Sequence, residues 1–204
     1  MTQVYEEDGS VVPVTVLTAG PCVVTQVKTV DSDGYLAMQL GFIDQKPQRL
    51  HKPQRAEAEK RGVPPKRVLR EVRLPAESTH SVGDVIKCDV FEKGDVVDVI
   101  GRCKGRGFQG GVRAWNFAGK RQTHGNMDQR GPGAIGMHTY PGRVLKGKKM
   151  PVRWGGERIT SKNHRIVAVQ PEDSLLLVKG AIPGAKNGLL LVRIARSQVY
   201  VPKG

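Results

Sequence analysis

The sequence predicts a mainly β fold with a long basic segment in its middle. Three observations support this: short runs of Val, Leu and aromatic residues fill the first hundred residues, similar runs follow residue 165, and the Gly-rich stretch between them has no apolar periodicity. With 204 residues, 38% of them hydrophobic, the chain can bury a core. We therefore expect a β globular part and an irregular extension.

The early strands are separated by turn signals at Gly20-Pro21 and Asp33-Gly34. Strands are expected at residues 11–16, 23–27 and 35–42. Because Pro13 has no N–H to donate to a ladder, we expect its strand to lie at an edge or a bulge.

A period-two alternation from Ile86 to Val90 predicts a half-buried strand there. Gly83-Asp84 recurs eleven residues later as Gly94-Asp95, each pair before an apolar run, which suits consecutive strands of a small barrel. Later strands are expected at residues 166–169, 175–178 and 189–194.

A basic, Pro-rich insertion at about residues 45–67 interrupts the early strands. Glu57 and Arg61 have the i, i+4 spacing that supports a helix, which we place at residues 55–61. Whether this insertion is a surface connection or contacts RNA is left open by the sequence.

The basic charge is concentrated in residues 102–165. This segment has 15 Lys and Arg against Asp128 and Glu157, which is +13 of the chain's net charge of +14. A solvated face usually mixes both signs, whereas one sign over such a length needs counter-charge from elsewhere, and nucleic-acid phosphates supply it. Only 18 of its 64 residues are hydrophobic, so we expect it to become ordered mainly against a partner.

Two Gly-rich motifs raise the alternative of a nucleotide-dependent enzyme. Residues 105–110 match the letters of the dinucleotide fingerprint, but no long helix is expected to follow them. Residues 142–149 come within one residue of a P-loop, but Lys149 replaces the Ser or Thr that holds magnesium, and Pro151 follows. Both motifs fit close approach of the backbone to phosphate better.

Other chemistry has no support in the spacing of residues. The histidines and cysteines form no metal-ligand pairs, and the two carboxylates of the basic segment are far apart, so we expect no catalytic residues, metal or cofactor. Three widely separated cysteines indicate reduced thiols. No apolar run is long enough to span a membrane, and the acidic start at Glu6, Glu7 and Asp8 is unlike a signal peptide.

Aromatic residues interleave the basic segment, where they could stack on bases or pack internally. We favour stacking, because every base offers a π-face, with Arg and Lys on phosphates. The expected RNA-binding residues are Lys104, Arg106, Phe108, Arg113, Trp115, Asn116, Phe117, Lys120, Arg121, His124, Arg130, Arg143, Lys146, Lys148, Lys149, Arg153 and Trp154.

Several blocks of the chain resemble the ribosomal protein L3 family of the large subunit. The specific ones are Lys104-Gly105-Arg106-Gly107-Phe108, Arg113-Ala114-Trp115-Asn116-Phe117 and Gly147-Lys148-Lys149-Met150, in the family's order. Further agreement lies at residues 1–4, 7–9, 13–16, 123–126, 132–136, 157–160 and 175–184.

The resemblance implies a translation-protein-type β-barrel at residues 1–101 and 166–204, with residues 102–165 as an extended RNA-binding loop. It further implies a non-enzymatic structural constituent that binds large-subunit ribosomal RNA, supports subunit assembly and reaches toward the peptidyl-transferase region. Expected partners are that RNA and neighbouring ribosomal proteins, without a membrane and without an independent homo-oligomer. A cytoplasmic ribosome is expected, or alternatively an organellar one. The alternatives are a nucleic-acid-binding barrel outside the ribosome and the nucleotide-dependent enzyme.

Overall fold

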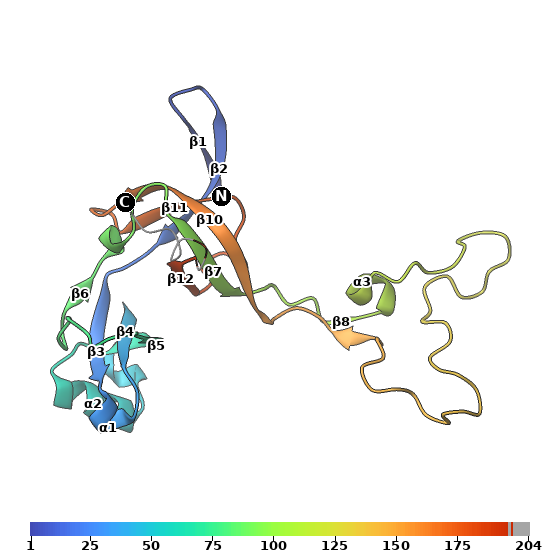
Figure 1. The fold of residues 1–204 in the computed structure, drawn as a ribbon, viewed down its shortest axis with the longest axis horizontal. Coiled ribbons are helices and arrows are strands. Elements are labelled where there is room, and N and C mark those ends of the chain that lie inside the picture. The colour runs from blue at the N-terminus through green and yellow to red at the C-terminus, as the bar shows by residue number, and fades with distance from the viewer. Residues whose placement is uncertain (196, 198–204) are drawn as a thin grey trace. The chain divides into compact units, whose positions relative to one another are not determined.

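The computed structural model describes residues 1–195 and 197, and it is mainly β, as the sequence predicts (Figure 1). The chain divides into two compact units. Unit 1 comprises residues 1–97, 163–181 and the described residues from 194 onward, and unit 2 comprises residues 98–162 and 182–193. Among the described residues, the strands form sheets of six, four and two strands. Their closure into a barrel stays a prediction.

The four-stranded sheet lies in unit 1 and has the order β5-β4-β3-β6. The expected strands at residues 23–27 and 35–42 are confirmed as the antiparallel pair β3 and β4. The strands are β3 (Cys22–Lys28), β4 (Ala37–Asp44), β5 (Lys66–Arg73) and β6 (Val85–Ile86), and a short helix, α1 (Val30–Asp33), joins β3 to β4.

The six-stranded sheet has the order β1-β2-β11-β10-β7-β12. Its strands are β1 (Thr2–Tyr5), β2 (Val11–Thr18), β7 (Val96–Arg102), β10 (Arg158–Gln170), β11 (Leu175–Lys179) and β12 (Leu190–Ile194). The later strands expected from the sequence are therefore confirmed. Val14, Leu176 and Val178 are fully buried here, because alternate residues of β2 and β11 face the core.

Pro13 lies neither on an edge strand nor at a bulge, contrary to the sequence prediction. β2 lies between β1 and β11. The ladder with β11 begins only at Val14, and the Pro13 carbonyl accepts a hydrogen bond from the Gly180 N–H at 2.8 Å. The missing N–H of proline thus falls where the ladder ends, so no interior hydrogen bond is lost.

The repeated Gly-Asp pairs each close a tight turn before a strand. The Asp84 carboxylate accepts the Ser81 N–H at 2.7 Å, and the Asp95 carboxylate accepts the Glu92 N–H at 2.9 Å. Gly83 and Gly94 both have positive φ, 99° and 98°, which glycine adopts without steric cost. The repeat is therefore a repeated turn, and it precedes β6 and β7.

The strand expected from Ile86 to Val90 is wrong beyond Ile86. Residues Cys88–Val90 form the 3-10 helix η2, in which Cys88 is buried and Val90 is 59% exposed. Alternation of apolar and polar residues over five positions also fits one tight helical turn with a single buried side chain. Cys22, Cys88 and Cys103 are free thiols.

The insertion contains η1 (Pro47–Arg49) and α2 (Lys52–Arg61), so the expected helix is confirmed and begins three residues earlier. The expected pair is formed, with 2.6 Å between the Arg61 guanidinium and the Glu57 carboxylate. Gly62, with a φ of 67°, ends the helix in the left-handed conformation.

Most of residues 102–165 is irregular. Its regular elements apart from β10 are β8 (Phe108–Gln109), α3 (Gly111–Trp115) and β9 (Val152–Arg153), and β8 pairs with β9 (Figure 1).

In the described part of the chain, no helix has the length and apolar character needed to cross a bilayer.

Replacing Asp95 with Ala should lower the free energy of unfolding by about 1 to 2 kcal/mol, because the buried turn loses a charge-assisted hydrogen bond. Asp84→Ala is the matched control, and it should cost less because the Asp84 side chain is half-exposed. Urea denaturation measures both. Equal losses would contradict the role of burial.

Candidate nucleic-acid interface

A two-stranded ribbon forms the base of the basic segment. Main-chain hydrogen bonds join Cys103 N–H to the Glu157 carbonyl at 2.9 Å, Arg106 N–H to the Trp154 carbonyl at 2.9 Å, and Trp154 N–H to the Gly107 carbonyl at 2.8 Å. These bonds need no apolar core, so the base is ordered by its own backbone.

Gly155 is required by this ribbon. Its φ is 79°, and a Cβ at this position would lie against the Lys104 carbonyl oxygen and within 3.0 Å of Gly105 Cα. The neighbouring Gly156 has a similar φ of 72° but no atom within 4 Å of such a Cβ. Close approach of two backbones, rather than φ alone, therefore selects glycine at residue 155.

Trp154 is held beside a cation. The Arg106 guanidinium lies 4.7 Å from the centroid of the Trp154 ring, within the range of a cation–π interaction. The ring is only partly exposed, whereas Arg106 is exposed. The sequence allowed this ring either to pack internally or to stack on a base. The structure shows an internal contact with Arg106 on one side of the ring, and base stacking by Trp154 remains a prediction.

Trp115 lies at the end of α3 and is fixed by its polar edge. Its indole N–H donates to the Met150 carbonyl at 2.7 Å, and the Lys149 ammonium lies 5.6 Å from the ring centroid. The hydrogen bond joins residues 35 positions apart, so it connects two stretches of the segment. The ring remains 39% exposed, which leaves apolar surface for a partner.

Phe117 packs inside the unit. Its ring lies so close to Gly111 that a Cβ on that glycine would come within 2.8 Å of it. Asn116 between them has a φ of 58°, a left-handed conformation that Asn tolerates, and this reverses the chain after α3. The packing role thus applies to Phe117, and its contact with a base would need the ring to move.

Residues 120–129 form a compact loop held by an ion pair. The Lys120 ammonium lies 3.0 Å from the Asp128 carboxylate, and the Lys120 N–H donates to the Gln129 carbonyl at 3.0 Å. The hydrogen bond from Lys120 holds the pKa of Asp128 below its usual value. Within residues 102–165, all of them described, Lys120 is the one cation with a carboxylate partner.

Residues 130–150 contain no helix or strand and are almost fully exposed. Apolar side chains point into solvent here, with exposed fractions of 86% for Tyr140, 66% for Met137 and 50% for Leu145. The expected set does not include these three residues, although Tyr140 is one of the aromatic residues that interleave the basic segment. Met137 and Leu145 lie in a loop, which gives no periodicity to identify them. Exposed apolar groups beside cations suit contact with base and sugar surfaces.

All 17 predicted RNA-binding residues lie in unit 2. Fifteen are exposed, and Phe117 and Trp154 are half-buried. The structure brings together Arg106 with Trp154 and Lys149 with Trp115. Their contact with RNA is not tested by this geometry.

The two Gly-rich motifs lack the long helix that a nucleotide-binding site requires. The helix that follows residues 105–110, α3, has only five residues, as expected for a motif without a long helix, and among the described residues no helix follows residues 142–149 directly. Among the described residues, no group of three or more His, Cys, Asp or Glu side chains is arranged to hold a metal ion.

Gly155→Ala should loosen the ribbon, because the added Cβ pushes residues 104–106 away from residue 155. The amides of Arg106 and Trp154 should then exchange hydrogen faster, as measured by mass spectrometry on the full-length protein. Gly156→Ala is the matched control with the same φ strain and no clash. Equal exchange in both variants would contradict the close-approach explanation.

Comparison with known proteins agrees with the family resemblance. The family model described as Ribosomal protein L3 matches residues 73–174. The chain is 51% identical to the large ribosomal subunit protein uL3 of Syntrophotalea carbinolica, covering 96% of this chain and 94% of that protein. It is 49% identical to the protein of that name from Thermotoga maritima, with 97% and 94% covered. The one from Syntrophobacter fumaroxidans is 48% identical, with 95% and 92% covered. The chain belongs to the ribosomal protein L3 family.

Proposed function

We propose that the chain is a structural constituent of the large ribosomal subunit that binds large-subunit ribosomal RNA through residues 102–165. One observation carries the RNA contact: fifteen cations, of which only Lys120 has a carboxylate partner, lie in a described segment with little apolar surface. Phosphates are the partner that compensates such a charge. The chain is not an enzyme, as its family consists of structural ribosomal components.

Within this proposal, the globular domain comprises residues 1–101 and 166–204, and the extension reaches toward the peptidyl-transferase region and supports assembly. Its neighbours are ribosomal RNA and other proteins of the large subunit, rather than further copies of the chain. The relatives compared above come from bacteria, which favours a cytoplasmic bacterial ribosome.

The proposed RNA contacts differ with the chemistry of the side chains. Arg143, Lys146, Lys148 and Lys149 are exposed and have no carboxylate partner among the described residues, so they are assigned to phosphates. Trp115 and Tyr140 keep exposed ring surface and are assigned to bases or sugars. The glycines between them let the backbone lie close to the RNA.

Neutralising two of these cations should reduce the salt dependence of RNA binding. Lys146→Gln with Lys148→Gln should reduce the magnitude of the slope of log K against log salt by about 1.4 to 1.8, if each lysine releases one counterion. Filter binding to a large-subunit ribosomal RNA transcript, over a salt series, measures this slope.

The matched control is Lys87→Gln with Lys93→Gln, two exposed cations of unit 1 outside the extension. This variant should keep the wild-type slope. Equal slopes for the extension variant and the wild type would exclude phosphate contact by Lys146 and Lys148.

Asp128→Asn should strengthen RNA binding, because Lys120 loses its internal counter-ion and becomes available to a phosphate. The magnitude of the salt slope should rise by about 0.7 to 0.9. In Glu157→Gln, which removes a carboxylate with no cation partner in the described structure, the slope should change less. A weaker affinity for Asp128→Asn would show that the loop needs the ion pair to bind RNA.

A further inference from the structure

A second basic surface lies on unit 1, outside the extension. Residues 45–73, which run from the end of β4 through α2 to β5, contain ten Lys and Arg against three Glu. We call this the α2–β5 surface. Two of its glutamates are already neutralised by its own arginines, with 2.6 Å between Glu57 and Arg61 and 2.8 Å between Glu59 and Arg55.

Five cations of this surface remain exposed or partly exposed without a partner in the described part of the chain: Lys46, Arg49, Lys52, Lys60 and Arg67. These five cations therefore have no contacting carboxylate. An anionic ligand would supply the counter-charge.

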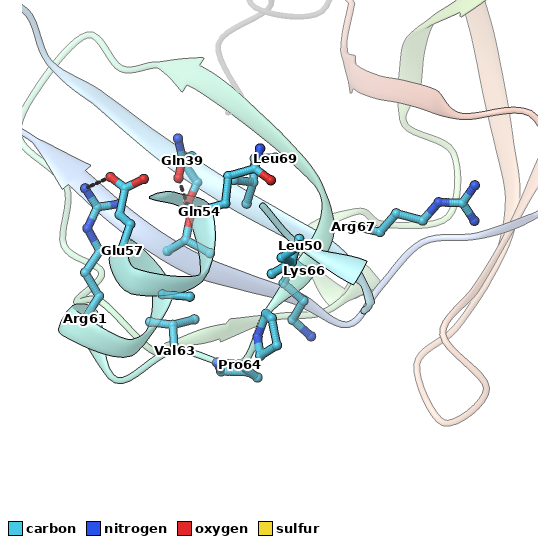
Figure 2. A pocket seen from close by; sticks show the side chains of 13 residues that line it. Gln39, Leu50, Gln54, Glu57, Arg61, Val63, Pro64, Lys66, Arg67 and Leu69 are labelled. Atoms are coloured by element: carbon cyan, nitrogen blue, oxygen red, sulfur yellow. Dashed lines mark hydrogen bonds and ion pairs between the residues drawn. The ribbon is translucent and has the colours of Figure 1, made fainter. Parts of the chain in front are cut away.

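A pocket of about 240 Å³ opens in this surface between α2 and the sheet (Figure 2). Leu50, Ala58, Val63 and Leu69 provide an apolar lining. Since one water takes about 30 Å³ of liquid volume, the pocket can accept a group the size of a ring. Gln54 lines it, and its side chain makes no hydrogen bond among the described residues, so its amide can donate to and accept from a ligand.

The side chains at the floor of the pocket are hydrogen-bonded to one another or to their neighbours. Thr25, which is 7% exposed, donates from its hydroxyl to the Gln39 side-chain oxygen at 2.7 Å. Beside it, Lys66 donates to the Asp44 carboxylate at 2.6 Å. These groups are satisfied internally, so the ligand would be recognised by the apolar walls, Gln54 and the exposed Arg67.

The first turn of α2 adds to the positive potential. His51 makes no side-chain cap, and Lys52 lies in that turn, so helix N–H groups remain open beside Arg49. The positive end of the helix dipole thus lies at the same place as the exposed cations.

We propose that the α2–β5 surface is a second RNA-binding site, in which one unpaired base enters the pocket and the flanking phosphates lie on Arg49 and Arg67. This rests on the proposed function, because it takes RNA as the polyanion that the protein meets. An acidic protein segment matches the charge but brings no flat apolar group to cover Leu50, Val63 and Leu69. A base covers these side chains with its face and meets Gln54 with its edge.

The test is crosslinking of the full-length protein to a 4-thiouridine-substituted large-subunit ribosomal RNA transcript, with the adducts mapped by mass spectrometry. We expect adducts in residues 49–69 as well as in residues 104–154. Ala58→Phe fills the pocket and should reduce the first group about fivefold or more, the lower end of what one stacked base contributes. The second group should stay unchanged.

The matched control is Ala56→Phe, which adds the same ring at an exposed position of α2 that does not line the pocket. It should keep the wild-type adducts. Arg67→Gln removes an exposed charge without filling the pocket. It should also reduce the adducts in residues 49–69, so it tests the site even if Ala58→Phe fails to fold.

Adducts confined to residues 104–154 would overturn the second site and leave the proposed function intact. The absence of adducts anywhere would contradict the proposed function itself. Binding of a fluorescent oligoglutamate that is lost in Ala58→Phe, without RNA adducts at residues 49–69, would assign the surface to an acidic protein segment instead.

Discussion

The uncompensated positive charge of residues 102–165 is the constraint on which the rest of the structure depends. With fifteen cations and two carboxylates, the segment cannot neutralise itself, and Asp128 is already taken by Lys120. Its apolar side chains are too few to form a core and many are exposed. Local order therefore comes from backbone bonds and glycine geometry, and the charge is left for an external polyanion.

The local structure of the segment follows from this constraint. The ribbon of β8 and β9 is held by main-chain hydrogen bonds, and Gly155 allows its two sides to meet. Trp115 is anchored by a hydrogen bond rather than by burial, so its ring remains partly exposed. A segment built in this way keeps its cations and rings on the surface, which is where an RNA ligand needs them.

Most of the fold could be predicted from local pattern, because β-branched runs, turn residues and one i, i+4 pair each act over a few positions. The strand at Ile86 to Val90 failed because alternation over five residues also suits a 3-10 turn that buries only Cys88. The packing of Phe117 on Gly111 depends on a reversal of the chain at Asn116, which the amino-acid composition does not predict. The high exposure of the Tyr140 ring and the pocket beside α2 emerge only once the chain is folded.

Lysine acetylation in the free protein and in assembled large subunits would test the central claim most directly. Within the subunit, RNA should protect the lysines of the extension from a small amine-reactive reagent, while Lys87 and Lys93 of unit 1 remain reactive. The protected set should comprise Lys104, Lys120, Lys146, Lys148 and Lys149. If the extension lysines react as fast in the subunit as in the free protein, the segment does not lie along RNA and the account is wrong.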